Sequence, residues 1–178
     1  MRVVAGRFGG RSLVAPGGRA TRPTSDRVRE ALFSILGADS IEGARVLDLF
    51  AGSGALAIEA LSRGASDAVF VDSSAAAGAA IRRNLSAVGV EAEVRRQTAL
   101  SYLEAARRDA RLYDLVFLDP PYRHVSTLGQ ELSARLGPVL APGARVVAES
   151  DRRAPLELDL RLLDERRYGD TLIRIHGS

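Results

Sequence analysis

From Arg45 onward, short apolar runs alternate with stretches of helical periodicity, and this alternation restricts the chain to few folds. The apolar runs have the length of buried strands and lie at 46–50, 68–72, 115–118 and 145–149. One helical stretch follows the first apolar run and ends near Arg63. Three others cover 75–88, 99–108 and 126–136. Repeated βα units of this length predict an α/β protein with a doubly wound, mostly parallel sheet.

Three weaker segments complete the expected sheet. The run 91–96 is too charged for a central strand, so we place it near an edge. Residues 158–163 and 171–175 alternate apolar with polar side chains, which predicts a closing antiparallel pair. The expected sheet therefore has seven strands.

Residues 1–40 precede this pattern and are expected to be an extension of the same folding unit, with the main domain over 41–178. The segments 2–8 and 11–15 are expected to pair as a β-hairpin across two glycines, a favoured turn pair. A helix is expected from Thr24 or Ser25 to Gly37, because its apolar residues recur at helical spacing.

Composition excludes several kinds of protein. At 178 residues, the chain has the size of one domain with a sizeable core. It has no cysteine, which excludes disulfides, thiolate metal sites and cysteine nucleophiles. His124 and His176 are far apart in sequence, so we expect no metal. No apolar stretch has the length of a membrane span or of a signal-peptide core, so we expect a cytoplasmic protein.

Positive charge is concentrated at the N-terminus. Residues 1–30 contain seven arginines and two acidic residues, a net charge of +5, whereas the whole chain carries +3. A solvated tail and a nucleic-acid-binding arm explain this distribution equally well.

The sequence Asp119-Pro120-Pro121-Tyr122 directly follows the apolar run 115–118. Ligands of open parallel sheets bind outside the carboxyl ends of the strands, and proline ends a strand because it cannot donate to the ladder. Carboxylate and carbonyl acceptors beside a phenol suit a flat ring that carries an exocyclic amine. The alternative is a structural acid and an ordinary loop tyrosine.

A glycine-rich turn follows the first strand. Gly52 and Gly54 allow a tight turn before a helix whose first N–H groups are free, and Asp72 lies where an acid can bind ribose hydroxyls. This spacing also fits a nicotinamide dinucleotide site, which would make the protein an oxidoreductase. Asp48 disfavours a pyrophosphate but suits a ligand with an ammonium and a sulfonium, namely S-adenosylmethionine.

Together these motifs resemble a known family. Asp-x-Phe-x-Gly-x-Gly over 48–54 with Asp-Pro-Pro-Tyr is similar to methyltransferases that act on exocyclic or amide nitrogens. The segments RVVAG (2–6), RPTSDRVREALF (22–33), LDLFAGSGAL (47–56), EALSRGA (59–65) and LAPG (140–143) resemble the RsmD-type bacterial 16S rRNA guanine-N2 methyltransferases. The resemblance covers nearly the whole chain. It implies a Rossmann-like S-adenosylmethionine-dependent fold, and a guanine, guanine 966, of the small ribosomal subunit as the target.

Two positions depart from the family pattern. The family usually has Glu where this chain has Asp72, a shorter acid that can fill the same role. Where Gly-Asp-Ala is common after the third strand, this chain has Gln97-Thr98-Ala99. The adenine amine of the cofactor would then be met by the Thr98 hydroxyl or by backbone.

The resemblance implies a role for each site residue. Asp119 and Pro120 would hold the target amine, and Tyr122 would stack on the extruded base. The residues expected to bind the cofactor are Asp48, Phe50, Gly52, Gly54, Asp72 and Thr98. Those expected to bind rRNA are Arg2, Arg7, Arg11, Arg19, Arg22, Thr24, Arg27 and Pro121, with Arg22, Thr24 and Arg27 closer to the cofactor. We expect a monomer that acts on 16S rRNA in the small ribosomal subunit. The alternatives are a DNA adenine-N6 or other amino-methyltransferase, a dinucleotide-binding protein, and a non-catalytic nucleotide-binding module.

Overall fold

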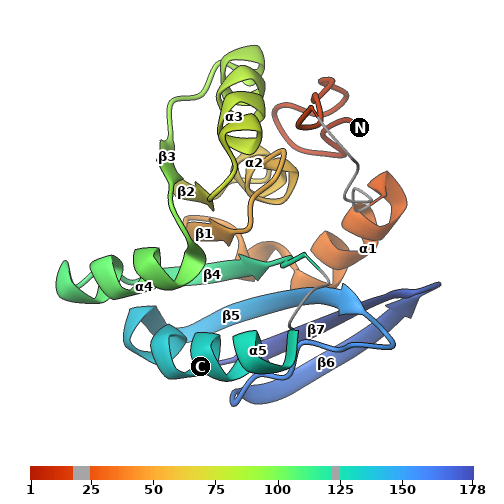
Figure 1. Ribbon diagram of the computed structural model, residues 1–178. Helices are drawn as coiled ribbons and strands as arrows, with labels where there is room; N and C mark the ends of the chain where they lie inside the picture. The colour runs from red at the N-terminus through yellow and green to blue at the C-terminus, as the bar shows by residue number, and fades with distance from the viewer. Residues whose placement is uncertain (18–24, 122–124) are drawn as a thin grey trace.

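A seven-stranded sheet with the order β3-β2-β1-β4-β5-β7-β6 crosses the molecule (Figure 1). The computed structural model describes residues 1–17, 25–121 and 125–178. Five strands are parallel, namely β1 (Arg45–Leu49), β2 (Asp67–Asp72), β3 (Glu93–Arg96), β4 (Tyr113–Leu118) and β5 (Leu140–Asp151). β7 (Thr171–Gly177) is antiparallel to β5 and to the edge strand β6 (Arg161–Tyr168). The expected α/β sheet is confirmed.

Helices cover both faces of this sheet. Their bounds are α1 (Asp26–Leu36), α2 (Ala55–Ser62), α3 (Ala75–Val88), α4 (Ala99–Arg108) and α5 (Val125–Leu136), with short 3-10 helices at Ala38–Ser40 and Gly137–Val139. One apolar cluster joins α1, α2, α3 and the first residues of the chain to one face, through side chains such as Phe33, Phe70 and Phe117. A second cluster packs α4 and α5 on the other face, around Leu103 and Val116. None of the helices in the described residues combines the length and apolarity of a membrane span.

The local signals in the sequence account for the helix ends. Ser25 caps α1 by accepting the Val28 N–H at 3.3 Å, and Ser74 caps α3 by accepting the Ala77 N–H at 3.4 Å. Gly89 ends α3 in the left-handed conformation, with a φ of 73°. The Ser74 cap places the beginning of α3 directly after the end of β2.

The N-terminal residues reverse direction as expected, but they do not form the regular β-hairpin that the sequence predicted. Residues 1–17, called the arm below, contain one antiparallel bridge, between Arg2 and Ser12, and no regular strand pair. The chain reverses direction through two successive turns. In the first, the Gly9 N–H donates to the Gly6 carbonyl, and in the second, the Arg11 N–H donates to the Phe8 carbonyl. Three backbone hydrogen bonds join residues 1–3 to residues 10–13. The pairing does not continue into a ladder, because the N–H groups of Val4, Ala5, Phe8 and Val14 bond to side chains of α2 and α3 instead.

The penultimate strand is also displaced from its expected position. It was expected at 158–163, but β6 covers Arg161–Tyr168. Leu158 and Leu160 pack in the second apolar cluster ahead of the strand. β6 forms the exposed edge of the sheet, where a charged segment is tolerated because only β7 pairs with it.

Candidate active site

Four carboxylates lie on the carboxyl ends of neighbouring parallel strands. Asp48 lies in β1, Asp72 ends β2, Asp119 follows β4 and Glu149 lies near the end of β5. Since Leu118 of β4 pairs with Leu49 of β1 and with Ala148 of β5, Asp119 and Glu149 lie at the same level on adjacent strands. Glu149 was not predicted. Its signal was the one that marked Asp119, an acid at the end of an apolar run.

The glycine turn between β1 and α2 contains three left-handed residues. Phe50, Gly52 and Gly54 have φ values of 64°, 56° and 76°. For Phe50 this conformation is strained, and such strain is concentrated at functional sites. A Cβ on Gly54 would lie 3.0 Å from the Phe70 ring, whereas a Cβ on Gly52 would meet only the Phe50 carbonyl oxygen, at 3.9 Å. Gly54 is therefore required by packing, and Gly52 leaves backbone open to a ligand.

Asp72 holds this turn in place. One of its carboxylate oxygens accepts the Gly52 N–H at 2.9 Å, and the other accepts the Ser74 N–H at 2.8 Å. Each carboxylate oxygen has two acceptor sites, so Asp72 retains capacity for ligand hydroxyls. The same side chain can therefore order the turn and bind a ribose.

Asp48 is a buried carboxyl behind the turn. Burial raises its pKa to about 7, with a smaller contribution from the negative charge of Asp72. It accepts the Ala57 N–H at 3.3 Å, in the first turn of α2. A cationic ligand would stabilise the ionised form of this carboxyl, so the site fits an ammonium or a sulfonium.

Asp119 shares this environment. Burial raises the pKa of its carboxyl well above the ordinary value, and the charges of Glu149 and Asp48 raise it further. Pro120 is buried and Pro121 is exposed. Tyr122 lies outside the described residues. No group of three or more His, Asp or Glu side chains in the described part of the chain is arranged as a metal site.

Thr98 follows β3 and caps α4. Its hydroxyl accepts the Ser101 N–H at 3.2 Å, and the side chain is exposed. The oxygen has a second acceptor site, so the cap does not exclude a bond from an adenine amine. The expected role of Thr98 stays a prediction.

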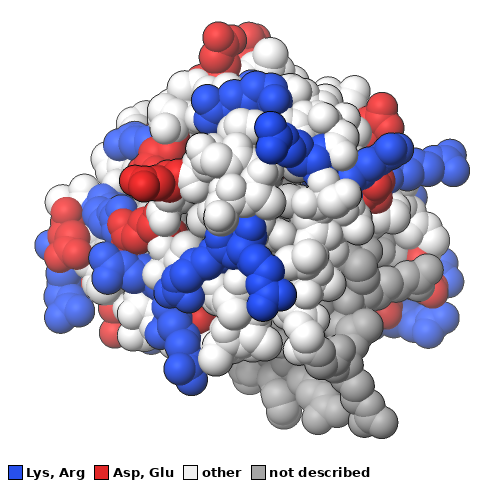
Figure 2. Space-filling view, turned by 90° about the horizontal axis from the view of Figure 1, so that it is seen from above, with Lys and Arg blue, Asp and Glu red and all other residues white. Residues whose placement is uncertain are grey.

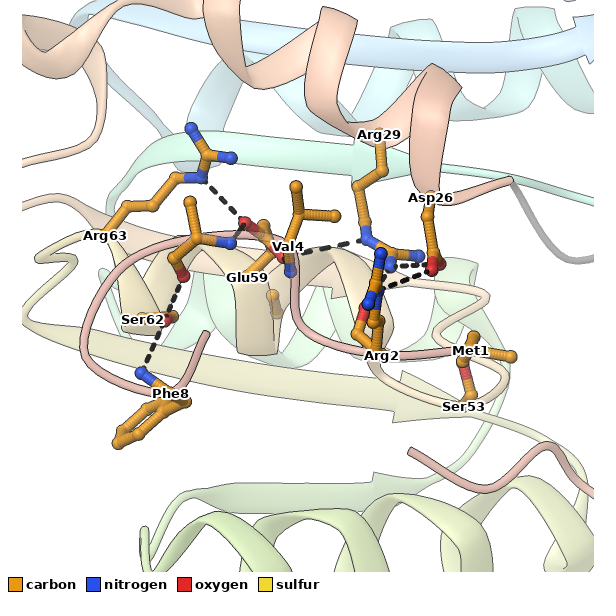
Figure 3. A network of polar contacts seen from close by, with 12 residues as sticks. Met1, Arg2, Val4, Phe8, Asp26, Arg29, Ser53, Glu59, Ser62 and Arg63 are labelled. Atoms are coloured by element: carbon orange, nitrogen blue, oxygen red, sulfur yellow. Dashed lines mark hydrogen bonds and ion pairs between the residues drawn. The ribbon is translucent and has the colours of Figure 1, made fainter. Parts of the chain in front are cut away.

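A buried glutamate holds the arm to the domain (Figure 3). Glu59 of α2 accepts the backbone N–H groups of Val4 at 2.7 Å and of Ala5 at 3.0 Å. Two arginines compensate its charge, since Arg63 Nε lies 2.8 Å and Arg29 Nε 3.7 Å from its oxygens. The arm is therefore a docked part of the fold.

Two further polar side chains fasten the arm. The Ser62 hydroxyl accepts the Phe8 N–H at 2.9 Å and donates to the Ala5 carbonyl. Asn84 of α3 accepts the Val14 N–H at 2.8 Å, and its amide donates to the carbonyls of Val14 at 2.9 Å and Ser53 at 2.8 Å. Because Ser53 belongs to the glycine turn, Asn84 connects the arm to that turn.

The predicted RNA-binding arginines have different environments. Arg2 forms an ion pair with Asp26 at 3.5 Å, and Arg7 lies 4.5 Å from the centre of the Phe8 ring. Arg11 donates to the Ala87 carbonyl of α3 at 3.0 Å, and Arg27 is exposed on α1. The predicted residues Arg19, Arg22 and Thr24 lie outside the described residues.

Arg29 belongs to the basic N-terminal stretch but is buried. It forms an ion pair with Asp26 at 2.8 Å and donates to the Arg2 carbonyl. Its helical position was the signal that could have shown this, because Arg29 lies three, four and seven residues before the buried Leu32, Phe33 and Leu36. The prediction missed it because the apolar face of α1 was read from aliphatic residues alone.

Comparison with known proteins decides the family. The family model described as "Conserved hypothetical protein 95" matches residues 1–177. The chain belongs to this family. It is the RsmD-type family, as the sequence resemblance predicted.

Members from two bacteria align along the whole chain. "Ribosomal RNA small subunit methyltransferase D" of Haemophilus influenzae is 34% identical, over 100% of this chain and 94% of its own length. YlbH of Bacillus subtilis is 39% identical, over 99% of this chain and 98% of its own length. The similarity to these RsmD-type relatives therefore includes the arm.

Solved structures agree with the fold. A hypothetical protein of Thermus thermophilus superposes with a TM-score of 0.86 at 28% identity, covering 100% of this chain and 99% of its own. A chain solved in complex with SAH has a TM-score of 0.70 at 19% identity, covering 86% of this chain and 49% of its own. The RsmD-type chain has the Rossmann-like fold of methyltransferases.

Proposed function

We propose that this protein transfers a methyl group from S-adenosylmethionine to the exocyclic N2 of a guanine in 16S rRNA, guanine 966. The observation that carries the proposal is the half-buried Asp119, which follows β4 beside the glycine turn of β1 in an RsmD-type chain. The Haemophilus influenzae relative is named a small-subunit rRNA methyltransferase, which favours methyl transfer over a nicotinamide reaction.

The carboxyl edge of the sheet has the groups that such a cofactor needs. Asp48 is suited to its cationic end, the turn at Gly52 to close backbone approach, and Asp72 to its ribose hydroxyls. Phe50 and Thr98 complete the proposed set. When bound, S-adenosylmethionine supplies an electrophilic methyl group. The task left to the protein is to orient a nitrogen toward it, which is worth about 7–11 kcal/mol of the barrier.

Asp119 and Pro120 orient the target amine. A guanine N2 amine is a weak nucleophile because its lone pair is delocalised into the ring. Hydrogen bonds from the amine to the Asp119 carboxylate and the Pro120 carbonyl would hold it and stabilise the positive charge that develops on nitrogen. Tyr122 would stack on the extruded base, with Pro121 beside it, a contact worth about 1–3 kcal/mol. The alkylated nitrogen is acidic enough for water to take the proton.

The arm and the residues that follow it supply the contacts with the RNA backbone. Arg2, Arg7, Arg11 and Arg19 would bind phosphates, and Arg22, Thr24 and Arg27 would lie nearer the reacting base. The natural substrate is the small ribosomal subunit, approached by a monomer in the cytoplasm. The docking of the arm on α2 and α3 supports this assignment, because a fixed arm presents its arginines in one geometry.

The test uses methyl-labelled S-adenosylmethionine and small ribosomal subunits that lack the modification. The expected product is N2-methylguanine, identified by digesting the labelled RNA to nucleosides. Asp119→Asn should bind the cofactor normally and slow methyl transfer by about 100-fold or more. The control is Asp109→Asn, which changes an exposed acid after α4. A labelled adenine, or an active Asp119→Asn protein, would contradict the proposal.

A further inference from the structure

Two adjacent arginines of α3 have no role in the site described above. Arg82 and Arg83 are exposed, and within the described residues no carboxylate lies within ion-pair distance of either. Neither belongs to the last turn of α3, so the helix dipole does not account for them. The rest of the outward face of α3 carries only short side chains, those of Ala75, Ala76, Ala79, Ser86 and Ala87.

Many other arginines of the chain are matched by acids. On β6 and β7, Arg166 pairs with Asp164 at 3.1 Å and Arg167 with Glu165 at 3.0 Å. Arg174 binds both Glu157 and Glu165. The arm and α3 differ, because residues 1–17 and 75–88 contain five arginines and no acidic residue. Positive charge on this surface is therefore not neutralised by its own elements.

The arm and α3 form one continuous surface. Arg11 of the arm donates to the Ala87 carbonyl near the end of α3, and Asn84 holds Val14 from the buried side of the same helix. Figure 2 views the molecule from the side on which the arm and the end of α3 stand in Figure 1, and arginines extend across the middle of this face. Most acidic side chains lie toward its periphery.

This surface also begins at the proposed active site. Ser74, which caps α3, is two residues beyond Asp72, and its N–H binds the Asp72 carboxylate. Arg82 lies about 12 Å further along the helix axis, at about 1.5 Å per residue. A nucleic acid whose base enters the site at the strand ends would have its neighbouring phosphates within reach of α3.

We propose that Arg82 and Arg83 bind phosphates of the rRNA, so that α3 and the docked arm form a single RNA-binding surface with Arg7 and Arg11. This inference rests on the proposed function, since it assigns a second element to the same substrate. Exposed arginines without acidic partners, beside short side chains that allow close approach, match a phosphate backbone and carry no base specificity.

The test compares two double variants. Arg82→Gln/Arg83→Gln removes the proposed contacts. Arg107→Gln/Arg108→Gln removes two exposed, adjacent arginines from α4, on the opposite face of the sheet. Binding to small subunits that lack the methylation is measured over a series of salt concentrations. Thermal unfolding and cofactor binding establish that each protein is folded.

The α3 variant should bind the subunits about tenfold more weakly at low salt and lower the slope of log affinity against log salt by about 1.5, since each lost phosphate contact contributes about 0.7–0.9. The α4 variant should bind as the unchanged protein does. An α3 variant with unchanged affinity and slope overturns this inference but leaves the proposed function standing. If the unchanged protein neither binds nor methylates the subunits, the proposed function itself fails.

Discussion

The carboxylate of Asp72 accepts the backbone N–H of Gly52 at 2.9 Å, so the end of β2 holds the turn that follows β1. The two residues are twenty positions apart and were each predicted to bind a ligand directly. Because Asp72 already holds Gly52, a ligand that contacts both residues would bind to a turn that is ordered before it arrives. Preorganisation of this kind lowers the entropic cost of binding.

The two glycines of the turn should respond differently to alanine. Gly54→Ala places a methyl 3.0 Å from Phe70, so it should destabilise the protein by about 1–3 kcal/mol in urea unfolding. Gly52→Ala has room and should cost about 1 kcal/mol for its left-handed backbone. Because its methyl occupies the open side of the turn, it should weaken cofactor binding at least tenfold by calorimetry. Unimpaired binding would remove Gly52 from the cofactor site.

Asp48→Asn should stabilise the protein at neutral pH. The pKa of Asp48 is about 7 in the fold and about 4 in the unfolded chain, so its contribution to stability is fully present below about pH 4 and is lost as the pH rises through 7. Asn has no such loss. The difference in unfolding free energy between Asp48→Asn and the unchanged protein should therefore grow by about 3 kcal/mol between pH 5 and pH 8. A difference independent of pH would show that Asp48 ionises normally.

Glu149→Gln should shift the pH dependence of methyl transfer. Asp119 must be ionised to stabilise charge on the amine, so the single-turnover rate should rise with pH through the pKa of Asp119. The negative charge of Glu149 raises that pKa, as burial does, so its removal should move the rise to lower pH. The rate on the high-pH plateau should change little. A midpoint that stays in place, or moves upward, would refute this coupling.

Gly6→Ala should release the arm, with Gly10→Ala as a matched control. Both glycines are left-handed, with φ of 79° and 81°, so the backbone cost is the same. A Cβ on Gly6 would lie 2.0 Å from the Ser62 carbonyl oxygen, whereas one on Gly10 meets nothing within 4 Å. Only Gly6→Ala should lower affinity for small subunits, by about tenfold, and speed proteolysis of residues 1–17. Equal effects of the two changes would mean that docking does not organise the RNA-binding surface.

Glu59→Ala should be one of the most destabilising single changes. It removes the acceptor of two backbone N–H groups and leaves Arg29 without its buried counter-charge. Breaking a buried pair in this way costs about 3–5 kcal/mol. Glu59→Gln keeps the shape and one acceptor, so chemical unfolding should show a smaller loss. If Glu59→Gln lowered the unfolding free energy more than Glu59→Ala, the stabilisation by Glu59 would not come from its hydrogen bonds and charge.

Local patterns in the sequence determined the order of strands and helices, the caps at Ser25, Ser74 and Gly89, and the strand ends that carry Asp72 and Asp119. These features depend on periodicity, caps and turn residues within a few positions of one another, so they can be read along the chain. Family membership was also predictable, because its motifs are short and contiguous.

Only the tertiary structure decided which charges are exposed and which are buried. Arg29 and Arg11 belong to the same basic stretch, but Arg29 compensates Glu59 in the interior while Arg11 binds the end of α3. Glu149 joined Asp119 because β5 pairs with β4. Contacts between residues 30 to 76 positions apart depend on strand pairing and helix packing, which no local pattern encodes.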